Sequence, residues 1–312
     1  AGFDPTALIG GFVPAFGAYH RVGASPWIVV ETDESDGSFQ LLDSTIAAML
    51  NIDRDHLDYY ADIDAIATAF ARYAARVHPH GSLVYNAQDA RLCRIAAGVR
   101  ADITRVACTT QPHAAADLRA DNIVCLPWSS RFTVHDAQGA YDVELGLPGR
   151  HNVDNALHAI AATRQAGVEP EAVQRACAAF HGVHRRFQVL GEFRGATVID
   201  DYAHHPREIE ATIRMARALE RPLLVVFQPH RFTRTATLLD DFVHVLGGLE
   251  RLVLTDIFSA GETPALTSGA VLHERVRAVN PGVVYTPDPA DISAVLARMT
   301  RPGDLLLFLG AG

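Results

Sequence analysis

The chain has 312 residues, a formal net charge of −9 at pH 7, 49% hydrophobic residues and 20% charged residues. A chain of this length is long enough for two globular domains, each with a sizeable core. All 27 basic residues are arginine and they form no basic run, so we expect no nucleic-acid partner and no membrane partner. The longest apolar stretches are strand-sized, well below the roughly 20 residues of a membrane span.

The cysteines give no sign of a metal site or a disulfide framework. Cys93, Cys108, Cys125 and Cys177 lie at spacings that fit neither. Reduced thiols are the simplest interpretation, and they predict a cytoplasmic protein.

The first part of the chain alternates short apolar runs with segments of helical spacing. Strands are predicted at 27–31, 46–50 and 82–85, and helices at 63–77, from about 87, at 153–166 and at 170–180. Alternating residues around a Gln138-Gly139 turn indicate an antiparallel insert at 123–147. We therefore expect a mostly parallel sheet with an antiparallel insert over residues 1–183.

The second part is a plainer alternation of strands and helices. Strands are predicted at 197–200, 223–227, 252–255, 283–285 and 305–309, with helices at 206–219, 238–246, 270–279 and 292–298. Buried strands that alternate with amphipathic helices predict a doubly wound, Rossmann-like domain over residues 184–312. In such sheets ligands lie beyond the carboxyl ends of the strands, so the polar residues after each apolar run are the candidates for chemistry.

An acidic loop follows the first predicted strand. Glu31, Asp33, Glu34 and Asp36 place four carboxylates within six residues. Because such charges repel one another, they are either solvated or bound to a divalent cation, and Mg²⁺ suits oxygen ligands of this kind. The residues alone leave both interpretations open.

A histidine follows the second predicted strand. His56 lies among Asp53, Asp55 and Asp58. A histidine in this setting either ligates a metal or positions a substrate. A polar loop with a helix cap is the alternative.

The segment GRHNVDNA leads into the helix predicted at 153–166. Asn152 and Asn155 lie one turn apart, and a carboxamide matches the hydrogen-bonding edge of adenine. A tight turn at Gly149 followed by an asparagine cap is the alternative. Near the domain boundary, Arg185 and Arg186 are either phosphate ligands or an ordinary surface pair.

Two dense polar segments follow strands of the second domain. The first, DDYAHHP, contains Asp201 and Tyr202 together with two histidines. The second, QPHRFTRT, contains His230, Arg231 and Arg234. These cationic groups predict an anion site, because the arginine fork pairs bidentately with a carboxylate.

Together these segments resemble the Mur ligase family. The strings that carry the resemblance are ETDESDGSF, NIDRDHLDYY, GRHNVDNA, RRF, DDYAHHPREI and FQPHRFTRT, which span essentially the whole chain in this order. The resemblance implies a central ATPase-type domain over residues 1–183 and a C-terminal domain over residues 184–312. It also implies an ATP- and Mg²⁺-dependent ligase that joins L-alanine to the lactyl carboxylate of UDP-N-acetylmuramate through an acyl phosphate.

The resemblance also assigns roles to individual residues. Glu31 and His56 would serve Mg²⁺ and the substrate end, and Asn152 and Asn155 would bind adenine. Arg186 would reach the ATP phosphates, and Asp201 would hold the ribose or help fix that side of the site. The amino-acid pocket would contain Tyr202, His230, Arg231 and Arg234.

Three features depart from the family pattern. The Gly-rich phosphate loop that ends in Lys-Thr is absent, as is the domain that holds the uridine nucleotide. With no lysine in the chain, the carbamoylated lysine that several relatives use near the metals is also missing. We expect a fragment of a longer enzyme, inactive by itself. Two alternatives remain, namely the related ligase that recycles a cell-wall tripeptide and a non-catalytic nucleotide-binding fragment.

Overall fold

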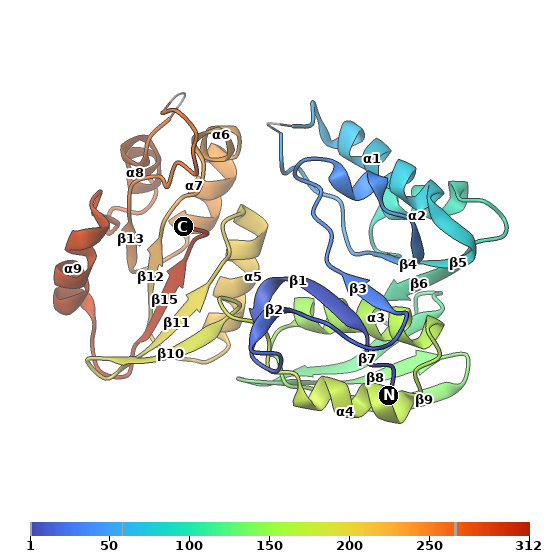
Figure 1. Ribbon diagram of the computed structural model, residues 1–312. Coiled ribbons are helices and arrows are strands. Elements are labelled where there is room, and N and C mark those ends of the chain that lie inside the picture. Colours follow the sequence, from blue (N-terminus) through green and yellow to red (C-terminus); the bar gives the residue numbers. More distant parts are fainter. Residues whose placement is uncertain (1, 58, 265–266) are drawn as a thin grey trace. The chain divides into compact units, whose positions relative to one another are not determined.

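The chain forms two compact units in the computed structural model, which describes residues 2–57, 59–264 and 267–312. The units are Ala1–Gly182 and Val183–Gly312, and each contains a six-stranded sheet covered by helices (Figure 1). The α/β class and the mostly parallel sheets predicted from the sequence are confirmed.

The described residues of the first unit form two sheets and four α-helices. Its strands are β1 (Thr6–Val13), β2 (Ala18–Arg21), β3 (Ile28–Val30), β4 (Ser44–Met49), β5 (Val77–Asn86), β6 (Thr104–Thr109), β7 (Leu118–Cys125), β8 (Ser130–Asp136) and β9 (Gly139–Leu145). Its helices are α1 (Ile63–Ala75), α2 (Ala90–Gly98), α3 (Arg150–Gln165) and α4 (Pro170–Ala179), with a short 3₁₀ helix, η1 (Ser38–Leu41).

The main sheet of this unit has the strand order β4-β5-β6-β7-β8-β9. Strands β4 to β7 are parallel, and β7, β8 and β9 form the expected antiparallel insert. Consecutive residues of β5 face opposite sides, since Leu83 packs with α1 and α2 whereas Val84 packs with α3 and α4. Figure 1 shows these helix pairs on the two faces of the sheet.

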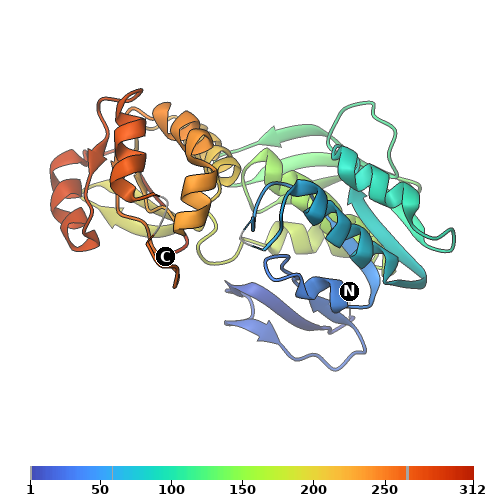
Figure 2. The same cartoon turned by 90° about the horizontal axis from the view of Figure 1, so that it is seen from above.

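The strand predicted at 27–31 forms, but it lies outside the main sheet. β3 pairs in parallel with β1, which pairs antiparallel with β2, and neither β1 nor β2 was predicted. The side chains of β3 are exposed, from 42% at Val30 to 63% at Ile28. A short apolar run predicts a strand, but it does not identify the strand with which it pairs. Figure 2 shows this small sheet in blue, separate from the main sheet of the unit.

The helix predicted at 63–77 ends two residues early, at Ala75. Val77 begins β5 instead, which extends well before the predicted 82–85. Pro79 explains the difference, because proline cannot continue a helix and favours extended backbone at His78. The helix expected from about 87 begins at Ala90, after Asp89 accepts two backbone N–H groups as its N-cap.

The second unit is a doubly wound sheet. Its strands are β10 (Gln188–Phe193), β11 (Ala196–Asp201), β12 (Leu223–Phe227), β13 (Leu252–Leu254), β14 (Val284–Tyr285) and β15 (Leu305–Leu309). Its helices are α5 (Pro206–Arg217), α6 (Phe232–Thr237), α7 (Leu239–Gly247), α8 (Gly269–Arg277) and α9 (Ile292–Met299), with a 3₁₀ turn, η2 (Pro289–Asp291).

The strand order of this sheet is β10-β11-β15-β12-β13-β14, and every pairing except β10 with β11 is parallel. β15 lies between β11 and β12 and is apolar at every position, as expected of a strand buried on both faces. Leu307 packs with α5, α7 and α8, whereas Leu306 packs with α9. The predictions at 223–227 and 305–309 match β12 and β15, but β10 and α6 were not predicted.

We predict that Leu307→Ala lowers the free energy of unfolding by about 2–5 kcal/mol, because it leaves a cavity in the middle of this sheet. Leu190→Ala, on the exposed edge strand β10, should change it by less than about 0.5 kcal/mol. Urea titration of the two variants checks both values. Equal effects would contradict the assignment of β15 as the central strand.

Candidate functional site

The segments that follow β11, β12 and β15 meet at the carboxyl-end edge of the second unit's sheet. The N–H of Gly310 donates to the Asp201 carbonyl at 3.2 Å, and the N–H of Gln228 donates to the Leu309 carbonyl at 3.0 Å. Because the three strands are parallel neighbours, their carboxyl ends lie together. This edge therefore gathers the second-domain residues that the sequence singled out.

Asp201 is the buried centre of this edge, with 4% of its surface exposed. Its carboxylate accepts the N–H groups of Phe187 at 2.7 Å and Ala203 at 2.8 Å, and the Thr212 hydroxyl at 3.3 Å. Burial raises the pKa of Asp201, although the Ala203 and Phe187 N–H groups and the charge of Arg186 oppose the rise. The carboxylate thus fixes three segments of chain at once.

The two arginines at the start of this unit lie over Tyr202. The guanidinium carbons of Arg185 and Arg186 lie 4.9 Å and 5.5 Å from the ring centre. Arg185 also donates to the Asp200 carboxylate at 3.2 Å and to the Gly310 carbonyl at 2.7 Å. Arg185 is therefore largely committed to internal contacts, and its neighbour Arg186 is the better placed of the two to bind a ligand.

Aromatic rings continue from Tyr202 to the turn after β12. His204 meets Tyr202 edge-on at 5.4 Å and His230 at 5.6 Å, and His230 stacks on Phe258 with the ring planes 11° apart. Glu208 lies beneath this row and accepts the N–H groups of His204 and His205. Burial alone would raise the pKa of Glu208, but the charge of His204 and these two N–H groups bring it below its usual value.

His230 is held as a neutral imidazole. Arg234 donates to its Nδ1 at 3.2 Å, so that nitrogen is an acceptor. Burial and the charges of His204, Arg234 and Arg231 lower the pKa of His230 to about 4, while Glu262 acts in the opposite direction. The turn after β12 therefore presents two permanent cations beside an uncharged ring.

The turn itself requires left-handed backbone at Arg231, where φ is 69°. This residue is the N-cap of α6, and its carbonyl accepts both the N–H and the hydroxyl of Thr235. The side chains of Arg231 and Arg234 therefore leave a fixed turn, not a mobile loop. The structure thus brings six predicted residues to one unit: Arg186, Asp201, Tyr202, His230, Arg231 and Arg234.

In the first unit, the segment GRHNVDNA forms the start of α3, which begins at Arg150, three residues before the predicted 153. Gly149 supports the turn with a φ of 93°, and Asn152 donates to the Pro148 carbonyl at 2.7 Å. Asn155 lies exposed on the first turns of the helix. Between them, Asp154 accepts the side-chain amide of Asn86 at 3.3 Å, which ties α3 to the end of β5.

The acidic loop and the histidine segment also lie together in this unit. Burial raises the pKa of Glu34. The backbone N–H of Glu34 and the charge of nearby His56 oppose this rise, whereas the charges of Asp33 and Asp55 add to it. The Tyr60 hydroxyl donates to the Glu34 carbonyl at 2.8 Å. Asp58, named with this segment, lies outside the described residues.

Glu31 has a different environment from Glu34. Its Oε2 accepts the Gly10 N–H at 2.7 Å, and a side chain at Gly10 would meet the Glu31 carboxylate at 3.1 Å. Glu31 thus lies against β1, and its Oε1 takes no part in the hydrogen bond to Gly10. Across residues 2–57, 59–264 and 267–312, no three His, Cys, Asp or Glu side chains gather into a ready metal site.

Five residues of these sites were not predicted. Glu34 was quoted only as part of the acidic loop, and His204 only as part of its motif. Glu208 follows His205 by three residues, and this spacing of a capping box was the signal available in the sequence. Glu262 follows β13, so the rule of polar residues after strands applies to it, whereas Phe258 in the same loop is apolar and lies outside that rule.

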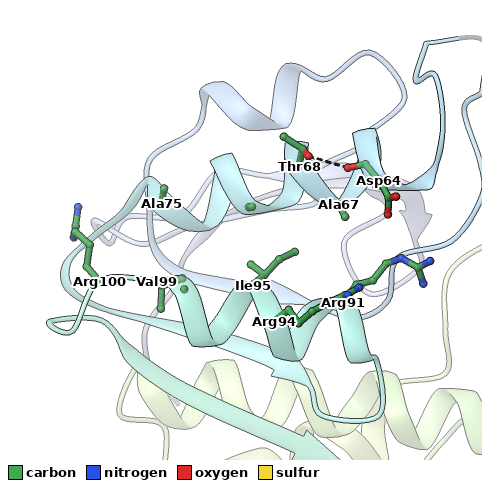
Figure 3. A pocket seen from close by; sticks show the side chains of 11 residues that line it. Asp64, Ala67, Thr68, Ala75, Arg91, Arg94, Ile95, Val99 and Arg100 are labelled. Carbon is green, nitrogen blue, oxygen red and sulfur yellow. Dashed lines mark hydrogen bonds between the residues drawn. The ribbon is translucent and has the colours of Figure 1, made fainter.

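A groove of about 460 Å³ lies elsewhere, between α1 and α2 (Figure 3). Small side chains of α1 form one wall, and three arginines border it: Arg91, Arg94 and Arg100. None of the predicted site residues lines this groove.

Comparison with known proteins agrees with the predicted resemblance. Residues 27–163 match the Mur ligase middle domain, and residues 185–312 match the Mur ligase glutamate ligase domain. The UDP-N-acetylmuramate–L-alanine ligase of Acidithiobacillus ferrooxidans is 40% identical over 321 residues, which cover 100% of this chain and 68% of that protein. The chain belongs to the Mur ligase family.

Other Mur ligases give the same picture. The UDP-N-acetylmuramate–L-alanine ligase of Halorhodospira halophila is 41% identical over 322 residues, covering 99% of this chain and 65% of that protein. The chain thus spans about two thirds of the length of the curated Mur ligases that it matches.

Solved structures share the Mur ligase fold. The crystal structure of the Thermotoga maritima UDP-N-acetylmuramate–alanine ligase has a TM-score of 0.80 at 24% identity, covering 99% of this chain and 66% of that one. The Psychrobacter arcticus murein peptide ligase has a TM-score of 0.72 at 22% identity, covering 99% and 69%. At these identities the likeness concerns the fold alone. No helix among the described residues is long and apolar enough to cross a membrane.

We predict that Asp201→Ala lowers the free energy of unfolding by about 2–4 kcal/mol, because it leaves the buried N–H groups of Phe187 and Ala203 without an acceptor. Asp240→Ala, which removes an exposed ion pair with Arg275, should cost less than about 1 kcal/mol. Chemical denaturation measures both. A near-neutral Asp201→Ala would show that Asp201 does not anchor this edge.

The low pKa of His230 predicts a pH-dependent stability. Unfolded histidine titrates near pH 6.5, whereas His230 in the folded chain titrates near 4. As pH falls from about 6.5 to about 4, the unfolded state binds a proton that the folded state does not, so stability declines. His230→Gln should make this decline shallower, and the exposed His244→Gln should not. Denaturation midpoints across this window test it, and parallel curves for wild type and His230→Gln would refute it.

Proposed function

We propose that this chain carries the catalytic residues of an ATP-dependent ligase that joins L-alanine to the lactyl carboxylate of UDP-N-acetylmuramate in peptidoglycan synthesis. The observation that supports it most is the identity of about 40% along the whole chain with curated ligases of that name. The physical support is the turn after β12 with His230, Arg231 and Arg234, called the cationic turn below. Its two guanidinium groups suit the carboxylate of a small amino acid.

The chemistry requires activation of a carboxylate. The lactyl carboxylate attacks the γ-phosphorus of ATP, which forms an acyl phosphate and releases ADP. The amine of L-alanine then attacks the acyl carbon, the C–O bond to phosphate breaks, and inorganic phosphate leaves as the amine loses a proton. Most of the catalysis in such a reaction is positioning and charge neutralisation.

The amino-acid pocket is assigned to Tyr202, His230, Arg231 and Arg234. Each guanidinium offers a fork that pairs bidentately with the L-alanine carboxylate. Neutral His230 orients Arg234 through their 3.2 Å contact and adds no third charge. The methyl group of alanine contributes little discrimination, about 1 kcal/mol, so the carboxylate is the main anchor.

The nucleotide-binding roles are those that the resemblance to the family implies. Asn152 and Asn155 would bind adenine, and Arg186 would bind the ATP phosphates. Asp201 is saturated by internal donors. This environment favours the second of its two predicted roles, which is to fix that side of the site, over direct contact with ribose.

The Glu31 carboxylate suits Mg²⁺, which takes oxygen ligands and commonly keeps only one or two protein carboxylates beside waters and substrate phosphates. Glu31 and His56 would hold it. When bound, Mg²⁺ supplies positive charge that offsets the repulsion between a carboxylate and the triphosphate. Use of ATP and a sugar nucleotide, together with the four free cysteines, supports a reaction in the cytoplasm.

Arg231 and Arg234 should control the KM for L-alanine. Replacing either by alanine should raise it far more than the KM for ATP, and Arg231→Lys should not restore it, because a point charge cannot reproduce the fork. Steady-state kinetics of the full-length gene product test this, with Arg217→Ala on α5 as the control. If only the KM for ATP changes, the turn is a nucleotide contact.

Glu31→Ala should lower kcat by roughly 10²-fold or more, as expected for loss of a group that stabilises transition-state charge. Exposed Glu171→Ala on α4 is the control. Phosphate release dependent on L-alanine and UDP-N-acetylmuramate measures it. Turnover like that of the wild type at moderate Mg²⁺ would reject this role for Glu31. The same assay with a cell-wall tripeptide in place of L-alanine tests the recycling alternative.

A further inference from the structure

The loop after β13 is joined to the cationic turn after β12. The Phe258 N–H donates to the Pro229 carbonyl at 2.8 Å, and the Arg231 N–H donates to the Phe258 carbonyl at 2.9 Å. These bonds form a short parallel bridge between His230 and Phe258, whose rings also stack. The loop after β13 is therefore hydrogen-bonded to the turn after β12 at both Pro229 and Arg231.

Glu262 closes this junction at the start of α6. Its Oε1 accepts the Thr233 hydroxyl at 2.6 Å, and its Oε2 accepts the Thr233 N–H at 3.1 Å. Burial alone would raise the pKa of Glu262, but the Thr233 bonds, the Phe232 N–H and the charge of Arg231 lower it. Glu262 thus holds its negative charge at the start of α6, the helix that has Arg231 as its N-cap and contains Arg234.

The charges of the turn can be counted. Arg231 and Arg234 contribute two positive charges, and His230 is uncharged near neutral pH, since its pKa lies at about 4. Glu262 offsets one positive charge, and the field of Arg231 acts on it directly. One net positive charge remains for a ligand. Glu208, the other nearby carboxylate, is held by His204 and by the start of its own helix.

We propose that Glu262 is a specificity-determining residue that limits the cationic turn to amino acids with a single carboxylate. It acts as the internal counter-charge of Arg231 and as the N-terminal cap of α6. This inference rests on the proposed function of the turn as the amino-acid pocket. A dicarboxylic amino acid would bring a second negative charge next to Glu262, and like charges set against each other disfavour the wrong ligand.

The test compares L-alanine with L-aspartate as the amine substrate of the full-length gene product. The quantity measured is the ratio of kcat/KM for L-aspartate to that for L-alanine. Glu262→Gln keeps an oxygen that accepts from Thr233 but removes the charge, so the ratio should rise about tenfold or more. Glu274→Gln, which changes an acid on α8 with 72% of its side chain exposed, should leave the ratio unchanged.

A second variant separates the charge from the cap. Thr233→Val removes the hydroxyl bond to Glu262 but keeps the carboxylate, so the ratio should stay near that of wild type even if both KM values rise. An unchanged ratio in Glu262→Gln would overturn the proposal, as would an equal rise in Thr233→Val. Failure of the wild type to ligate L-alanine would overturn the proposed function itself, and that outcome is seen before any variant is compared.

Discussion

The buried carboxylate of Asp201 is the interaction on which the second unit's polar edge depends. It accepts hydrogen bonds from the segments on either side of β11 and from α5, so the chain before the sheet and the chain after the strand share one anchor. A buried carboxylate is costly unless its acceptors are satisfied. Here three hydrogen-bond donors satisfy the Asp201 carboxylate. The same bonds fix the two segments that bring Arg186 and Tyr202 beside each other.

The remaining parts of the edge follow from this arrangement. The ring of His204 contacts both Tyr202 and His230. Phe258, from the loop after β13, stacks on His230. Both arginines of the cationic turn then project from a backbone that is bonded on both flanks. Such preorganisation lowers the entropy lost on ligand binding, which is where a site for a substrate as small as alanine gains most.

Sequence reasoning was most successful where one pattern had one structural solution. β12 and β15 were predicted at their observed bounds because five consecutive apolar residues between turns suit a strand buried on both faces. β10 was missed because its side chains are mostly exposed, and β3 was predicted without its place in a separate sheet. For the candidate site, Arg231 was identified from its motif. Glu262 was not, because its bond to Thr233 joins a loop to helix α6 across 29 residues of sequence.

The central claim is that the cationic turn recognises the carboxylate of the amino acid. The most direct measurement replaces that carboxylate on the substrate: kcat/KM for L-alaninamide is compared with that for L-alanine in the full-length gene product. The amide keeps the attacking amine and the methyl group but presents no charge to the arginines. We predict a loss of about 10³-fold or more, the scale for removing a charge-assisted bidentate contact from a site built around it. Equal use of the two substrates would contradict the account.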